Sequence, residues 1–282
     1  MKNTGQDDKV YSIEFFPPKT VEGREKLKNT IKDLGKLNPR YFSVTFGAGG
    51  STQQGTLETV FDIQEAGFDA APHLSCIGSK KKDLRDLLNT YIDRGINRIV
   101  ALRGDIPSGM GGDAGEFRYA NELVEFIRKE TGDHFYIEVA AYPEFHPQAP
   151  NAATDMKNFV RKVKAGADSA ITQYFYNPEA YFRFVDEAAG LGVDIPVFAG
   201  IMPITNFEQL ARFSDTCGAE IPRWIRKRLE GYGNDIESIR NFGMEVTIDL
   251  CRTLIKGGAP GLHFFSMNQA GPTTAIWKAL DL

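Results

Sequence analysis

Short apolar runs recur along the chain, and polar segments with a helical repeat separate them. Runs of roughly four to eight apolar, β-branched and aromatic residues are typical of buried strands, whereas apolar positions spaced by three and four residues predict amphipathic helices. The predicted strands cover residues 10–16, 40–46, 68–74, 97–102, 135–141, 169–175, 195–201 and 261–265. The predicted helices between them cover residues 21–34, 56–66, 83–94, 116–129, 152–165 and 178–190. Strand and helix therefore alternate.

Glycines mark the ends of several predicted helices, shortly before the next strand. They are Gly35, Gly67, Gly95 and Gly166. Glycine is favoured just after a helix because it adopts a left-handed backbone conformation without steric cost. These positions support a repeating unit of one strand and one helix.

About eight such units in 282 residues predict an α/β fold, the (β/α)₈ or TIM barrel. A doubly wound sheet usually has fewer strands or an appended domain. We expect one catalytic barrel domain over residues 1–282, with residues 1–9 as a flexible amino-terminal tail. The interval 205–258 is longer than the others and predicts an insertion of about three helices.

Charge and composition narrow the classes of partner. The formal net charge is −4, and no basic run is longer than residues 80–82, so a nucleic-acid partner is not expected. No leader-like or membrane-spanning apolar stretch is present, which favours a cytoplasmic protein without a membrane partner. The cysteines form no CxxC pair, so neither a disulfide framework nor a zinc knuckle is indicated. A small-molecule substrate is the expected partner.

Polar residues stand where the predicted strands end, which is where barrel enzymes assemble their active sites. They are Glu14, Thr45, His73, Arg103, Asp105, Tyr142, Glu144, Gln173 and His263. Glu14 lies among Phe15, Phe16 and other apolar residues. Partial desolvation there is expected to raise its pKa, as a general acid requires. The alternative is a glutamate at a strand edge that faces solvent.

Three further segments each allow two interpretations. Arg103 and Asp105 can serve a ligand or form an ion pair that shapes the turn. Segments 47–51 and 108–115 partly resemble a phosphate-binding loop and a dinucleotide fingerprint, but neither has the full spacing, so both can be plain connectors. In the helix 152–165, the three-and-four spacing predicts a basic face that meets a pyrophosphate or only solvent; it comprises Lys157, Arg161 and Lys164.

Other catalytic mechanisms have less support. The strand ends offer no lysine for a Schiff base, and no Gly-x-Ser-x-Gly elbow or adjacent Cys and His pair is present. A metal-dependent lyase or hydrolase stays open, although the spacing of its candidate ligands matches no known metal motif, so no metal is expected. Those candidates are Glu14, His73, Asp105, Glu144, His146 and His263. A barrel that only binds or scaffolds is disfavoured, since buried polar groups would carry desolvation costs without a benefit.

Segments 14–18, 43–48, 71–74, 101–105, 141–144, 171–173 and 200–203 resemble, in this order, those of the methylenetetrahydrofolate reductases. The resemblance covers essentially the whole chain and is to the short catalytic form. It implies a tightly but non-covalently bound FAD without a Rossmann unit, with NADH or NADPH as co-substrate. In a ping-pong cycle, the reduced nucleotide would reduce the flavin, and 5,10-methylenetetrahydrofolate would then be reduced to 5-methyltetrahydrofolate for methionine synthesis. It also implies a homo-oligomer.

The resemblance further assigns roles to residues. Glu14 would be the general acid that helps to open the folate's one-carbon ring, and Asp105 would face flavin and pterin. Gln173 would bind the pterin, and Phe207 would stack on the folate or the nicotinamide. Expected flavin contacts are Thr45, His73, Arg103, Gly104, Asp105, Tyr119, Ala120, Tyr142, His146, Asp155, Asn158, Arg161 and Lys162. One departure is clear: Gln269 stands where many relatives have an arginine near the substrate end.

Overall fold

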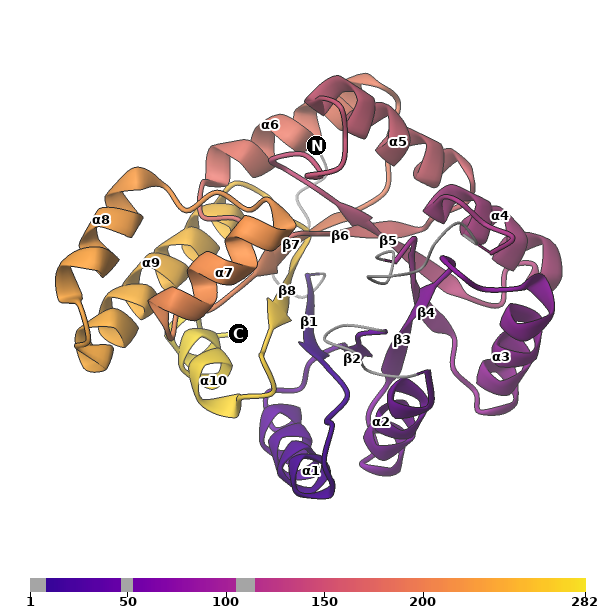
Figure 1. The fold of residues 1–282 in the computed structure, drawn as a ribbon, viewed down its shortest axis with the longest axis horizontal. Coiled ribbons are helices and arrows are strands. Elements are labelled where there is room, and N and C mark those ends of the chain that lie inside the picture. The colour runs from indigo at the N-terminus through magenta and orange to yellow at the C-terminus, as the bar shows by residue number, and fades with distance from the viewer. Residues whose placement is uncertain (1–8, 47–52, 105–114) are drawn as a thin grey trace.

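Eight parallel strands close into a barrel in a computed structural model that describes residues 9–46, 53–104 and 115–282. Each strand pairs with its neighbour in the sequence, and β8 pairs with β1 to close the ring (Figure 1). The strands are β1 Val10–Phe15, β2 Tyr41–Val44, β3 Ala70–Ser75, β4 Arg98–Leu102, β5 Tyr136–Ala141, β6 Ser169–Thr172, β7 Val197–Ile201 and β8 Gly261–Phe265. The predicted (β/α)₈ barrel is confirmed.

Helices surround the strands (Figure 1). Their bounds are α1 Val21–Gly35, α2 Gln53–Glu65, α3 Lys81–Asp93, α4 Ala120–Thr131, α5 Ala152–Lys164, α6 Pro178–Gly190, α7 Phe207–Cys217, α8 Arg223–Tyr232, α9 Ile236–Lys256 and α10 Ala270–Ala279. The predicted insertion of three helices is confirmed by α7, α8 and α9, which lie together on one side of the barrel. The main discrepancy is α4, which begins four residues after the predicted 116, with Tyr119 as its N-cap residue.

The alternation of residues in β1 shows how the strands separate core from site. Ile13 and Phe15 are buried, and the Phe15 ring stacks on Phe42 of β2 with centroids 5.0 Å apart. Successive side chains of a strand point to opposite faces, so Ser12 and Glu14 point into the barrel. The apolar set thus packs beneath the helices, and the polar set lines the interior.

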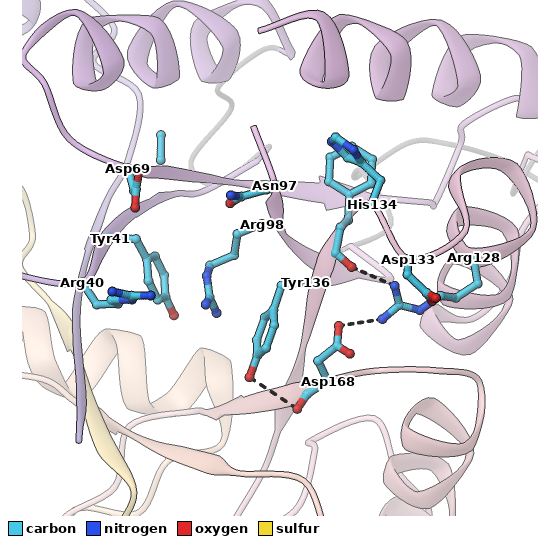
Figure 2. Close-up of a pocket in the computed structure, with 12 residues that line it drawn as sticks. Arg40, Tyr41, Asp69, Asn97, Arg98, Arg128, Asp133, His134, Tyr136 and Asp168 are labelled. Atoms are coloured by element: carbon cyan, nitrogen blue, oxygen red, sulfur yellow. Dashed lines mark hydrogen bonds and ion pairs between the residues drawn. The ribbon is translucent and has the colours of Figure 1, made fainter. Parts of the chain in front are cut away.

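The amino-terminal end of the barrel is closed by a layer of aromatic and charged side chains. The Arg98 guanidinium lies between the rings of Tyr41 and Tyr136, at 4.5 and 3.9 Å from their centroids (Figure 2). Its Nη1 is 3.2 Å from Oε1 of Glu138, which is fully buried. Tyr41 Oη also donates to Glu138, at 2.7 Å, and Ser169 Oγ donates at 2.9 Å.

A cavity of about 440 Å³ lies at this amino-terminal end, where most of the lining residues stand at or just before the starts of β2 to β6 (Figure 2). Barrel enzymes place their chemistry at the carboxyl ends of the strands instead. In the lining, Arg128 is held by Asp168 at 2.6 Å and by the backbone oxygen of Phe135 at 2.7 Å. We therefore assign this layer to stability of the barrel.

Two general expectations can be compared with the described ranges. No helix within them is both long and apolar enough to cross a membrane. Cys76, Cys217 and Cys251 are all free thiols, as the absence of a paired motif predicted.

Candidate functional site

Glu14 lies between two histidines at the carboxyl-terminal mouth of the barrel. His263 of β8 and His73 of β3 place their Nε2 atoms 3.2 and 3.3 Å from Glu14 Oε2. Only the His263 contact is a hydrogen bond, because the buried His73 Nε2 has no hydrogen-bond partner in the described chain. The Glu14 side chain is 14% exposed, so this carboxylate can still be reached from the mouth.

The pKa of Glu14 differs from the sequence-based expectation. Burial raises it, but the charge of His73 and the hydrogen bond from His263 outweigh burial and lower the pKa to about 2. The expected rise was wrong because Phe15 points to the outer face of the sheet, whereas two imidazoles from other strands face the carboxylate. Glu14 is therefore ionised at neutral pH in this structure.

A serine extends the contact between Glu14 and His263. Ser12 Oγ lies 2.7 Å from His263 Nδ1, within the barrel. Since the ionised carboxylate can only accept a hydrogen bond, the Nε2 atom of His263 carries a proton and donates a hydrogen bond to Glu14. Ser12, His263 and Glu14 thus form a continuous hydrogen-bonded chain. Sequence analysis missed Ser12, although its position two residues before Glu14 places it on the same strand face.

The connection after β8 fastens the end of β1. Ser266 Oγ donates to the backbone oxygen of Glu14 at 2.6 Å. The side chain of Asn268 accepts from Phe16 N at 3.0 Å and donates to Phe16 O at 2.8 Å. Met267 and Asn268 both have positive φ, at 52° and 56°. The connection after β8 therefore holds the backbone at Glu14 and Phe16, which sequence analysis did not predict.

Unpaired polar atoms line the strand ends near Glu14. Thr45 follows β2, and its buried Oγ1 has no hydrogen-bond partner among the described residues, like His73 Nε2. A buried polar atom without a partner is costly, so such atoms indicate where a ligand or water completes the site. The two atoms belong to residues expected to contact a cofactor.

Gly104 is required by the turn after β4. Its φ is +85°, and a Cβ at this position would lie 1.8 Å from Ser75 Oγ. Arg103 beside it directs its guanidinium to the backbone oxygen of Gly104 and to Gln148 Oε1. The backbone after β4 therefore passes very close to the end of β3. Asp105, the next predicted site residue, lies outside the described residues, as do segments 47–52 and 105–114.

The connection from β5 to α5 brings several predicted residues together. The rings of Tyr142 and His146 meet edge to face, with centroids 4.6 Å apart. Asp155 of α5 accepts from the backbone N–H of His146 at 2.9 Å. Glu144 of the same segment turns to another connection, since it accepts from Glu220 N at 2.7 Å.

Helix α5 separates its basic residues into two groups. Lys157, Arg161 and Lys164 are exposed on one face, as the spacing predicted, and Arg161 Nη1 donates to Asn158 at 3.1 Å. Lys162 turns inward and donates from Nζ to the backbone oxygen of Ala140 in β5. Burial lowers the pKa of Lys162 to about 8. The cationic group of Lys162 therefore faces the barrel, whereas those of Lys157, Arg161 and Lys164 face solvent.

A model of the methylenetetrahydrofolate reductase family matches residues 1–281. Two proteins named 5,10-methylenetetrahydrofolate reductase, from Salmonella typhimurium and Escherichia coli, are 41% and 40% identical over 272 residues. Each alignment covers 96% of this chain and 90% of the relative. The chain belongs to the methylenetetrahydrofolate reductase family.

A solved structure supports the same fold at low sequence identity. A Clostridium thermocellum protein described as binding two copies of 5-methyl-5,6,7,8-tetrahydrofolic acid superposes with a TM-score of 0.67 at 15% identity. The match covers 98% of this chain and 96% of that one. The barrel fold of this chain is thus shared with a protein of low sequence identity.

The residues expected to meet substrate in a methylenetetrahydrofolate reductase follow three strands. Gln173 follows β6, and its Oε1 accepts from Tyr174 N at 3.0 Å. Phe207 is partly buried at the first position of α7, after β7. Gln269 is the exposed N-cap residue of α10, after β8. Tyr119 and Ala120 stand farther round the barrel at the start of α4, where Tyr119 is 58% exposed.

The candidate metal ligands form no such site in the described residues. No group of three or more His, Cys, Asp and Glu side chains is arranged there to hold a metal ion. Oε2 of Glu144 accepts from Glu220 N, and Asp105 lies outside the described residues. No observation of the site therefore favours the metal-dependent lyase or hydrolase over the reductase family.

Proposed function

We propose that this protein reduces 5,10-methylenetetrahydrofolate to 5-methyltetrahydrofolate with NADH or NADPH through a bound FAD, in a ping-pong cycle that supplies methionine synthesis. The observation that carries the proposal is Glu14 between His73 and His263 at the mouth of a barrel of this family. Such a group can deliver a proton inside a partly buried site. Proton delivery is what opening of the folate's one-carbon ring requires.

The residues at the mouth fit a flavin. Thr45 Oγ1 is a buried polar atom without a partner among the described residues, so it is available to a ligand rich in carbonyl and ring nitrogen groups. His73, whose Nε2 lies 3.3 Å from Glu14 Oε2, would lie beside that ligand. Gly104 lets the backbone pass where a side chain would collide with Ser75. With Arg103, these residues would hold the isoalloxazine side of the cofactor.

The other residues carried over from the resemblance would hold the rest of the FAD. They are Tyr119, Ala120, Tyr142, His146, Asp155, Asn158, Arg161 and Lys162. Exposed Arg161 and inward-facing Lys162 would lie near the phosphate or adenosine end of the cofactor. Bound FAD would supply the hydride chemistry, accepting hydride from the nicotinamide and donating it to the folate.

Glu14 would pass a proton to the folate nitrogen that is released when the one-carbon ring opens. Because Glu14 rests ionised, the proton must reach it first. A doubly protonated His263 would be the donor already in contact, and it would become a neutral imidazole when its Nε2 proton passes to Glu14. Ser12 at the far ring nitrogen keeps that imidazole oriented while its charge changes. In this scheme Glu14 and His263 act together as the acid.

Gln173 and Phe207 would orient the folate. The Gln173 amide oxygen is engaged by Tyr174 N, while its amide nitrogen has no partner among the described residues and can donate to the pterin. Phe207, at the start of α7, offers a partly buried ring for stacking. Asp105 would complete this group near flavin and pterin.

The visible spectrum of the purified protein tests the proposal first. Flavin bands that bleach on anaerobic addition of NADH and return on addition of methylenetetrahydrofolate are the expected result. Repeating the first step with NADPH decides between the nucleotides, and we propose NADH. A protein that stays colourless with added FAD would contradict the proposal. If it also had a lyase or hydrolase activity that a chelator abolishes, the metal-dependent alternative would be favoured.

A further inference from the structure

A second cavity, of about 290 Å³, opens on the carboxyl-terminal rim between the connections that follow β7 and β8. Its walls include Ile204 and Thr205 from the first connection and Gln269 from the second. Gln269 N donates to Ser266 O at 2.9 Å, and Ser266 Oγ donates to the backbone of Glu14. Two hydrogen bonds through Ser266 therefore connect the lining of this cavity to the backbone of Glu14, the proposed acid.

The lining of this cavity is mostly apolar and carries one ionisable side chain, Arg240 of α9. No Asp or Glu lines it. Arg240 is exposed, and within the described ranges its guanidinium makes no hydrogen bond or ion pair. An unpaired guanidinium above an apolar wall suits a ligand with an apolar body and an anionic end.

Close packing at Gly243 fixes the position of the α9 backbone that carries Arg240. Gly243, one turn later on α9, is buried against the connection after β7, and a Cβ there would lie 2.3 Å from Ile204 O. Residues three and four positions apart share a helix face, so Arg240 and Gly243 face the same connection together with Met244. The glycine lets α9 approach closely enough for the arginine to reach the rim.

We propose that Arg240 binds the carboxylates of the folate's glutamyl tail and thereby supplies the positive charge that position 269 lacks in this chain. The inference rests on the proposed function. At about 290 Å³ the cavity is at the lower limit of ligand sites, so it takes one end of a folate rather than the whole molecule. Its apolar wall accommodates the ring that joins pterin and tail, and Arg240 meets the charge beyond it.

Calorimetric titration of the oxidised, FAD-loaded enzyme tests this. The probes are 5-methyltetrahydrofolate and the same compound without its glutamyl group, and the variants are R240Q and a control, R223Q, on exposed α8. Loss of one charge-assisted hydrogen bond predicts about tenfold weaker binding of the complete folate to R240Q. The truncated probe should bind R240Q and wild type equally, and R223Q should bind both as wild type does.

A double variant tests the position of the charge. Because Gln269 and Arg240 line one cavity, R240Q/Q269R should recover most of the lost affinity. Equal affinity of R240Q and wild type for the complete folate, or an equal loss for both probes, overturns the role of Arg240 while leaving the reductase proposal intact. A wild-type enzyme that binds neither probe overturns both proposals.

Discussion

His263 Nε2 lies 3.2 Å from Glu14 Oε2, and the two residues come from strands at opposite ends of the sequence that pair where the barrel closes. The other ring nitrogen of His263 lies 2.7 Å from Ser12 Oγ. A carboxylate with this support is ionised at neutral pH. We therefore expect the proton-transfer function to depend on the pair, and the first predictions follow from it.

Replacement of Glu14 by Gln should separate the two half-reactions. Glu14→Gln should retain flavin and its reduction by NADH, because neither needs the proton, but should slow folate reduction by about 10²-fold or more. Stopped-flow absorbance of the flavin measures each half separately. Glu187→Gln on the exposed surface of α6 is the control and should match wild type. Normal folate reduction by Glu14→Gln rules out the acid role.

Ser12→Ala should have a smaller effect on the same half-reaction. It leaves the His263 contact with Glu14 but removes the group at the far nitrogen, so we expect folate reduction to slow by roughly threefold to tenfold, with flavin reduction unchanged. The pH profile of folate reduction by Ser12→Ala should also differ from that of wild type. Thr90→Ala on α3 is the control, since the Thr90 hydroxyl donates to Asp86 O within its own helix. Equal rates and pH profiles for Ser12→Ala and wild type would show that Ser12 has no part in proton transfer.

The low pKa of Glu14 predicts a pH-dependent contribution to folding. A carboxyl group whose pKa falls from 4.5 to about 2 on folding stabilises the protein above the unfolded pKa and loses that contribution as pH falls through this interval. The free energy of unfolding of wild type minus that of Glu14→Gln should therefore shrink between pH 4.5 and about 2. Urea unfolding at several pH values measures it. A difference that stays constant on acidification contradicts the ion-pair assignment.

Gly104→Ala should disturb the turn after β4. The new Cβ would meet Ser75 Oγ in addition to straining a positive φ, so we expect a loss of about 2 kcal/mol in stability and weaker FAD retention. Gly95→Ala is the control, because Gly95 has a φ of +71° with nothing within 4 Å of an added Cβ. Thermal unfolding and flavin release measure both effects. Equal losses for the two variants would show that backbone strain alone matters at Gly104.

Arg98→Met should destabilise the barrel without a specific effect on catalysis. It leaves the fully buried Glu138 without its cationic partner, which costs about 3–5 kcal/mol. Arg85→Met breaks a surface pair with Glu130 and should cost less than about 1 kcal/mol. Should Arg98→Met fail to fold, Arg98→Met/Glu138→Gln removes both charges, keeps an acceptor for Tyr41 and Ser169, and should recover stability. A change in folate affinity of the folded double variant would show that the amino-terminal cavity has a binding role.

The sequence by itself determined the barrel and the positions of its strand ends. The periodicity of apolar residues is local, so it located every strand, and it predicted the three helices between β7 and β8. Barrel enzymes build their active sites at the carboxyl ends of the strands, which made Glu14, His73 and His263 candidates. Sequence reasoning could go this far because each step depended only on neighbours along the chain.

The tertiary structure decided what surrounds those candidates. Phe15 and Phe16 are the sequence neighbours of Glu14, but its spatial neighbours are His73 and His263, which reverse the direction of its pKa shift. Arg240 likewise shares a cavity with Gln269, although it belongs to a different helix. Electrostatic interactions act through space between groups that barrel closure brings together, so no local pattern in the sequence contains them.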